Sequence, residues 1–171
     1  TDLGVTAADD ALKRAIKATR RQLAEDTALI TIKNAVKADG ELRFDVKVEN
    51  HTGHKFPAGY PSRRAWLMVD VKAGQTEVFS SGAYTMKGTI EGIENERALE
   101  HKNVVTSPGD VVIYETIAVD AEGKPTTMLS EMAKVKKDTR LLPQGWRADG
   151  PHAEQTKPIG VGDDPDFAAG Q

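Results

Sequence analysis

The stretch that decides the fold is LRFDVKVE, residues 42–49. Apolar and charged side chains alternate along it without a break, which predicts a β-strand with one buried face and one solvated face. The dipeptide Asp39-Gly40 just before it is typical of a two-residue hairpin turn, and Ile30 and Ile32 precede that turn in phase with each other. The sequence therefore predicts an antiparallel hairpin at this point.

Further strand patterns follow on the carboxyl side. They cover residues 65–71, 77–80 and 111–119, whereas residues 126–135 fit either a strand or a short helix. Turn signals separate these strands, and they do not alternate with helices as the strands of a parallel sheet do. We therefore predict a mainly β fold, an antiparallel β-sandwich of the immunoglobulin-like or jelly-roll-like kind.

One helix is predicted on the amino side, over residues 6–25, with Thr6 as its N-cap. Its apolar residues fall on one stripe at helical spacing. Its other side carries five basic residues, which are Lys13, Arg14, Lys17, Arg20 and Arg21. Such a side is either a solvated face or a docking face for an acidic partner or a propionate-rich cofactor.

These patterns divide the chain into three parts. Residues 1–26 form the amphipathic helix and a linker, residues 27–145 the β-sandwich, and residues 146–171 an irregular wrapping tail rich in Pro, Gly and Asp. A chain of 171 residues is long enough to bury one core. Because it begins with Thr1 rather than Met, we expect it to be processed or excised from a longer product.

The composition excludes several classes of function. The 23 Lys and Arg against 26 Asp and Glu give a net charge of −3, which excludes a nucleic-acid-binding polycation. No apolar run approaches the roughly 20 residues of a membrane-spanning helix. Cysteine is absent, so the chain forms no disulfide, thiolate zinc site or iron–sulfur cluster and attaches no haem c covalently.

Candidate binding residues gather in residues 50–66, NHTGHKFPAGYPSRRAW. Pro and Gly stiffen this loop, and His51 and His54 among basic neighbours suit a metal, a haem or an anion. Two imidazoles do not complete a metal site, so a structural role for each histidine stays open. The candidate metal ligands, taken together, are His51, His54, His101, Asp163, Asp164 and Asp166.

Glu115 shares its strand face with apolar residues, so its carboxylate requires a basic partner. Arg63 and Arg64 lie at the start of a neighbouring predicted strand, and we expect one of them to pair with Glu115. The pair is interpreted as structural, with a catalytic carboxylate as the alternative. No nucleophile, base and oxyanion donor come together in the sequence, so we assign no catalytic residue, and an enzyme in its own right is the third interpretation.

The loop of residues 50–66 resembles a motif in the C-terminal, non-haem portion of bacterial multihaem c-type cytochromes. Further matches follow in the same order and extend the resemblance over most of the chain. They are residues 79–82, His101, residues 113–115, 137–145 and 162–167. On the amino side, residues 3–23 resemble the segment that joins the haem-binding part to this module.

The resemblance implies a β-sandwich module of a periplasmic or extracellular multihaem cytochrome, which supports electron transfer by packing beside the haem-binding part. Haem c is then expected in an upstream segment or in a partner cytochrome chain. His54 and His101 are the residues that carry over as candidate haem or metal ligands.

The alternative is a free-standing metal-binding or surface-recognition sandwich that uses the His54 loop. The two differ in their surfaces, because a packing module exposes an apolar patch that its partner covers. A self-sufficient binder instead has a closed surface and a polar pocket around His54 and His101.

Overall fold

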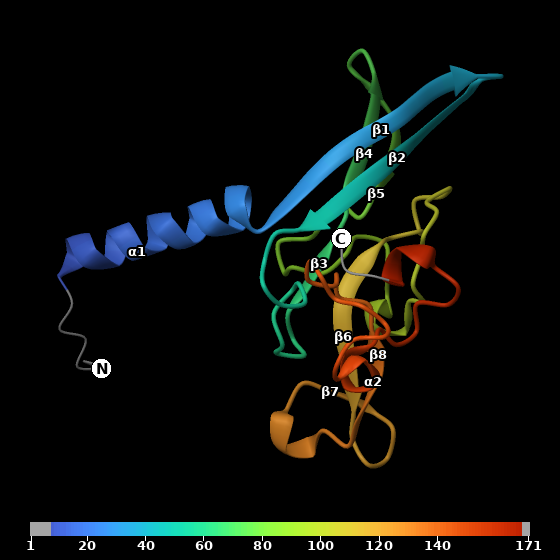
Figure 1. Cartoon of the computed structure of the whole chain (residues 1–171). Helices are drawn as coiled ribbons and strands as arrows, with labels where there is room; N and C mark the ends of the chain where they lie inside the picture. Colours follow the sequence, from blue (N-terminus) through green and yellow to red (C-terminus); the bar gives the residue numbers. More distant parts are fainter. Residues whose placement is uncertain (1–7, 169–171) are drawn as a thin grey trace. The chain divides into compact units, whose positions relative to one another are not determined.

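The computed structural model describes residues 8–168 and divides the chain into two compact units after Gly53. Figure 1 labels its helices and strands. In order they are α1 (Asp9–Arg21), a π-helical turn η1 (Gln22–Asp26), β1 (Ala28–Ala38), β2 (Glu41–Asn50), β3 (Arg64–Trp66), β4 (Val69–Ala73), β5 (Thr76–Ser81), η2 (Glu96–Ala98), β6 (Ile113–Val119), β7 (Pro125–Thr126), η3 (Leu129–Glu131), β8 (Lys134–Asp138), α2 (Ala153–Thr156) and η4 (Pro165–Phe167).

The fold is mainly β, its sheets are antiparallel, and one longer helix precedes them, as predicted. The sandwich arrangement and the three-part division of the chain stay predictions. The predicted N-cap, Thr6, lies outside the described residues, within which Ala8 stands at the N-cap position of α1. None of the helices in residues 8–168 combines the length and the apolar character needed to span a membrane.

In the first unit, β1 and β2 form the predicted hairpin, a long two-stranded ribbon (Figure 1). Asp39 and Gly40 both have positive φ, 53° and 81°, which is the conformation that a two-residue turn of the favoured twist requires. This turn fixes the register and opposes Ile30 to Val48 and Ile32 to Val46.

The register gathers apolar side chains on one side of the ribbon, which we call the ribbon face. It consists of Ile30, Ile32, Leu42, Phe44, Val46 and Val48. Phe44, Val46 and Val48 are half-buried, whereas Ile30 and Ile32 are 59% and 64% exposed. The ribbon therefore has the apolar face of a core strand pair but leaves much of it in water.

In the second unit, β6 is the central strand and every one of its residues is buried. It pairs with β3, β7 and β8. Ile113 of β6 forms a core cluster with Ile90 and Val111, against which Trp66, Ile93 and Leu99 pack. The candidate site is built around this strand.

The predicted strand over residues 65–71 is wrong, because the chain forms two strands there. β3 pairs with β6 as far as Trp66, and Leu67 still donates its N–H to the carbonyl of Val112 (3.0 Å). The chain then leaves this edge and pairs with β5 as strand β4. Gly82, just after β5, lies against the break, where its carbonyl accepts a hydrogen bond from the Trp66 indole (2.9 Å).

Replacement of Gly82 tests this close approach. Gly82 has φ +73°, and a Cβ there would lie 2.2 Å from the Leu67 carbonyl oxygen. We expect Gly82→Ala to cost about 1–2 kcal/mol for the left-handed backbone and about 1–3 kcal/mol more for the overpacking. Gly74→Ala is the matched control, since φ is +64° but nothing lies within 4 Å. Equal losses in urea denaturation would contradict the close packing of Gly82 on Leu67.

Candidate functional site

Glu115 is buried in β6 and paired with a cation, as the sequence predicts. Its side chain is 3% exposed, and its Oε1 accepts a hydrogen bond from Lys137 Nζ at 2.9 Å. Lys137 Nζ also donates to the carbonyl of Leu99 (2.8 Å). The buried carboxylate is therefore neutralised, and the lysine ties β8 and the loop before β6 to it.

The predicted partner of Glu115 is wrong, because neither Arg63 nor Arg64 pairs with it in the described structure. Arg64 does lie opposite Glu115 in the β3–β6 register. Its guanidinium instead forms an ion pair with Glu96, whereas Arg63 is exposed. Lys137 reaches Glu115 from the other side of β6.

The strand register and the contacts of Arg64 explain why Lys137 rather than Arg64 reaches Glu115. Lys137 lies opposite Ile117 in the β6–β8 register, and residues two apart on a strand share a face, so Lys137 is diagonal to Glu115. Arg64 is drawn away because its guanidinium stacks on Trp66 (5.1 Å to the ring centroid) and donates to the Gly88 carbonyl (3.1 Å).

Arg64 also borders a hollow beside β6. The hollow has a volume of about 600 Å³ and a largely polar lining. Glu115 lies at its wall, and both members of the Arg64–Glu96 pair line it. Of the charged residues that line it, Arg64 is paired with Glu96 and Glu115 with Lys137, so these two pairs have a structural role at its wall.

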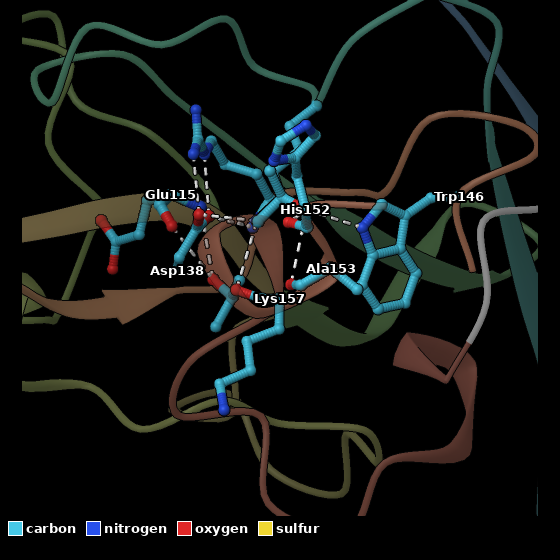
Figure 2. Close-up of polar contacts among 10 residues, drawn as sticks. Glu115, Asp138, Trp146, His152, Ala153 and Lys157 are labelled. Carbon is cyan, nitrogen blue, oxygen red and sulfur yellow. Dashed lines mark hydrogen bonds and ion pairs between the residues drawn. The ribbon is translucent and has the colours of Figure 1, made fainter. Parts of the chain in front are cut away.

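Asp138, the neighbour of Lys137, is the centre of a second buried charge cluster. Lys55 Nζ donates to its Oδ2 (2.8 Å), and Arg140 binds both carboxylate oxygens at 2.7 Å. Figure 2 shows the dashed contacts that converge on Asp138. Burial works to raise the pKa of Asp138, but the hydrogen bonds from Arg140 and Lys55 outweigh burial and hold that pKa below its usual value.

The loop that carries Lys55 is fixed to the segment after β8. Phe56 and Leu141 exchange two backbone hydrogen bonds of 3.0 Å and 2.9 Å, and the Phe56–Pro57 peptide bond is cis. Asp138 and Ile159 exchange a further pair, of 2.8 Å and 3.0 Å. The loop, β8 and the C-terminal segment are thus held together around Asp138.

His101 forms a third buried pair, with Asp164. Its Nε2 lies 2.7 Å from Asp164 Oδ2, and the two side chains are 6% and 5% exposed. The ring packs edge-on against Phe167 at 5.2 Å, and its buried Nδ1 has no hydrogen-bond partner within residues 8–168. Burial, together with the carboxylates of Asp164 and Asp166, raises the pKa of Tyr114 to about 12, so this tyrosine stays a phenol.

The remaining candidate ligands are spread over the surface. His51, in the first unit, and His54, in the second, are both exposed, and so are Asp163 and Asp166. His54 Nδ1 lies 2.9 Å from the carbonyl of Lys55, which gives it a local backbone contact. Of the predicted ligands the structure brings together His101 and Asp164, and in residues 8–168 no three His, Asp or Glu side chains gather as a metal would require.

Sequence reasoning missed the role of four of these residues, which are Lys55, Asp138, Arg140 and Lys137. A signal for one contact was present, since Asp138 and Arg140 are two apart at the end of a strand and so share a face. Nothing local pointed to Lys55, which is 83 residues from Asp138 along the chain.

No family model matches this chain, and no curated protein or solved structure matches it. The assignment of the site therefore rests on its own geometry. That geometry shows the Glu115–Lys137 ion pair, the charge cluster at Asp138 and the His101–Asp164 hydrogen bond, all buried in the second unit.

Breaking the Glu115–Lys137 pair should destabilise the second unit strongly. Lys137→Met leaves the Glu115 carboxylate buried without a cation, which costs about 3–5 kcal/mol. The double variant Glu115→Leu, Lys137→Met should recover most of that loss, because apolar side chains replace both charges. Urea denaturation measures both, and a single variant as stable as the wild type would contradict the buried pair.

The stability of the protein should fall in acid through Asp138. Because its pKa is lower in the folded than in the unfolded chain, Asp138 stabilises the fold above about pH 4, and this contribution is lost as pH falls through the folded pKa. Asp138→Asn should be less stable than the wild type at neutral pH, and the difference should narrow toward about pH 2. Thermal melts against pH check this, with the exposed Asp163→Asn as control. A constant difference across that range would be inconsistent with this role.

Proposed function

We propose that this chain is a β-module of a periplasmic or extracellular multihaem cytochrome, which supports electron transfer by packing beside the haem-binding part. The chain has no cysteine and attaches no haem c itself. The haem would come from an upstream segment or from a partner cytochrome chain.

The ribbon face is the observation that carries this proposal. Ile30 and Ile32 are 59% and 64% exposed, and Leu42 on the same face is 48% exposed. Full burial of an aliphatic side chain of this size stabilises a complex by roughly 1.5–3 kcal/mol. A contiguous apolar face of this kind marks an interaction surface.

The cytochrome-like motifs contribute residues that hold this chain together. Lys55 of the loop motif, Glu115, Lys137 and Asp138 are held in buried ion pairs. The need to pair each buried charge accounts for these residue types in the motifs, without any haem in the chain. The module would then be a rigid framework, and the haem-binding part would carry the electrons.

The candidate haem ligands differ in what they could do in such an assembly. His101 is enclosed by Asp164 and Phe167, so a haem iron from a partner could reach it only after the segment of η4 had moved. His54 is exposed on its loop and is the one of the two placed to contact a neighbour. The proposal gives His101 a structural role and His54 a contact role.

The alternative is a metal-binding or surface-recognition domain using the His54 loop, and the one observation that favours metal binding lies at His101 rather than on that loop. A carboxylate on one ring nitrogen of a histidine is the usual arrangement behind a metal-bound imidazole, and His101 with Asp164 has it. Titration of the chain with Zn²⁺ or Ni²⁺ separates the two functions, because the proposed module binds neither specifically.

The test begins with the gene. The reading frame upstream of Thr1, or an adjacent gene, should encode a segment with Cys-x-x-Cys-His sites, and that segment is expressed with its haems as the binding probe. Absence of any such segment overturns the proposed function.

Binding of this probe should depend on the ribbon face. We expect the double variant Ile30→Ser, Ile32→Ser to raise the Kd, measured by calorimetry, by at least about tenfold, because two exposed aliphatic side chains are lost from the interface. The matched control is Met128→Ser, Leu129→Ser, two exposed apolar residues of the second unit. A wild-type chain that does not bind the probe, or an equal effect of both double variants, would refute the proposal.

A further inference from the structure

Helix α1 presents a basic flank that the ribbon face leaves unexplained. Lys13, Lys17 and Arg20 follow one another at helical spacing and project from one side, and Arg14 and Arg21 continue that side one row further round. All five side chains are exposed.

The charges of this flank are largely unmatched. Within residues 8–168, Arg21 is the one member that forms an ion pair, with Glu25 at 3.2 Å and Asp26 at 3.9 Å. Lys13 and Lys17 are four residues apart, as are Lys17 and Arg21, and like charges at this spacing destabilise a helix. Asp9 and Asp10 stand four residues before Lys13 and Arg14, so the first turn of α1 has mixed signs, whereas from Arg14 to Arg21 the helix carries cations and no acid.

An apolar stripe runs beside the basic flank. Leu12 and Ile16 of α1 and Leu23 of the following turn η1 lie along it and are 43%, 53% and 64% exposed. No residue of α1 is buried in the described structure. An isolated helix of 13 residues is marginal in water and is normally stabilised by tertiary packing of its apolar side. Within residues 8–168, α1 has no buried residue to provide such packing.

We propose that α1 docks into a groove of the haem-bearing part, with the apolar stripe on an apolar floor and the basic flank against a rim of Asp and Glu carboxylates. This inference rests on the proposed function, because it names the chemistry of the same partner. Opposite charge on the rim relieves the like-charge repulsion within the flank, and the floor supplies the burial that α1 lacks.

The sequence of α1 favours a protein groove over a lipid surface. The stripe has no aromatic residue, and Asp9 and Asp10 open the helix, where anionic headgroups would repel them. The basic residues also lie to one side of the stripe, which fits a groove with one acidic rim.

The experiment uses the full 171-residue chain and its haem-bearing partner. The triple variant Lys13→Gln, Lys17→Gln, Arg20→Gln removes three charges of the flank and keeps the stripe. Its control, Lys124→Gln, Lys134→Gln, Lys136→Gln, removes three exposed charges of the second unit. Affinities are measured between about 50 mM and 200 mM salt, where screening of exposed charges changes.

We expect the triple variant to bind roughly tenfold more weakly at the lower salt and to lose most of the salt dependence, with the control close to wild type. Zero-length carbodiimide cross-linking of the wild-type complex should join Lys13 or Lys17 to an Asp or Glu of the partner. Equal affinities and equal salt dependences of the triple variant and the control would overturn the inference. The proposed function would still stand if the Ile30→Ser, Ile32→Ser variant binds the partner more weakly than its own control.

Two further outcomes would overturn the inference alone. One is a cross-link from Lys13 or Lys17 to a second copy of this chain instead of the partner. The other is that the wild-type chain, but not the triple variant, sediments with vesicles of equal parts phosphatidylglycerol and phosphatidylcholine, and that added partner does not displace the wild-type chain from these vesicles. A wild-type chain that binds no haem-bearing partner overturns the inference together with the proposed function.

Discussion

Two adjacent residues of β8, Lys137 and Asp138, place a cation and an anion on opposite faces of the same strand. Lys137 neutralises Glu115 in the central strand, and Asp138 holds Lys55 and Arg140. Because successive side chains of a strand point to opposite faces, one strand serves two buried clusters. Buried ions require partners at short range, so the β6–β8 register and the position of the Lys55 loop depend on each other.

The two units differ in how far their charged and apolar groups are provided with contacts. In the second unit the buried charges are paired with one another and the central strand is covered. In the first unit, Ile30 and Ile32 of the ribbon face and the apolar stripe along α1 are exposed. The unmet requirement for burial lies in residues 8–53, and the proposed function assigns it to contact with a haem-bearing neighbour.

Sequence patterns predicted the parts of the fold that local physics determines. Asp39 and Gly40 specified the turn, alternation specified β2, and the position of Glu115 among apolar residues specified its burial. The break at Leu67 was not predictable, because it depends on Gly82, which is distant in sequence. The partner of Glu115 was also missed, since strand phase places Arg64 and Lys137 equally well, and only the pairing of Arg64 with Glu96 decides between them.

When no partner covers the ribbon of β1 and β2, its strand edges can promote aggregation of the protein. Within residues 8–168 no third strand pairs with this ribbon, so the outer edge of each strand offers unpaired N–H and C=O groups beside an apolar face. Such an edge is a template for aggregation. The bulge between Lys33 and Val36 interrupts this edge, with Asn34 in a left-handed conformation and bonded to Asp45 at 2.6 Å. This bulge and the lysines near it act as gatekeepers against intermolecular β-pairing while the ribbon face is uncovered.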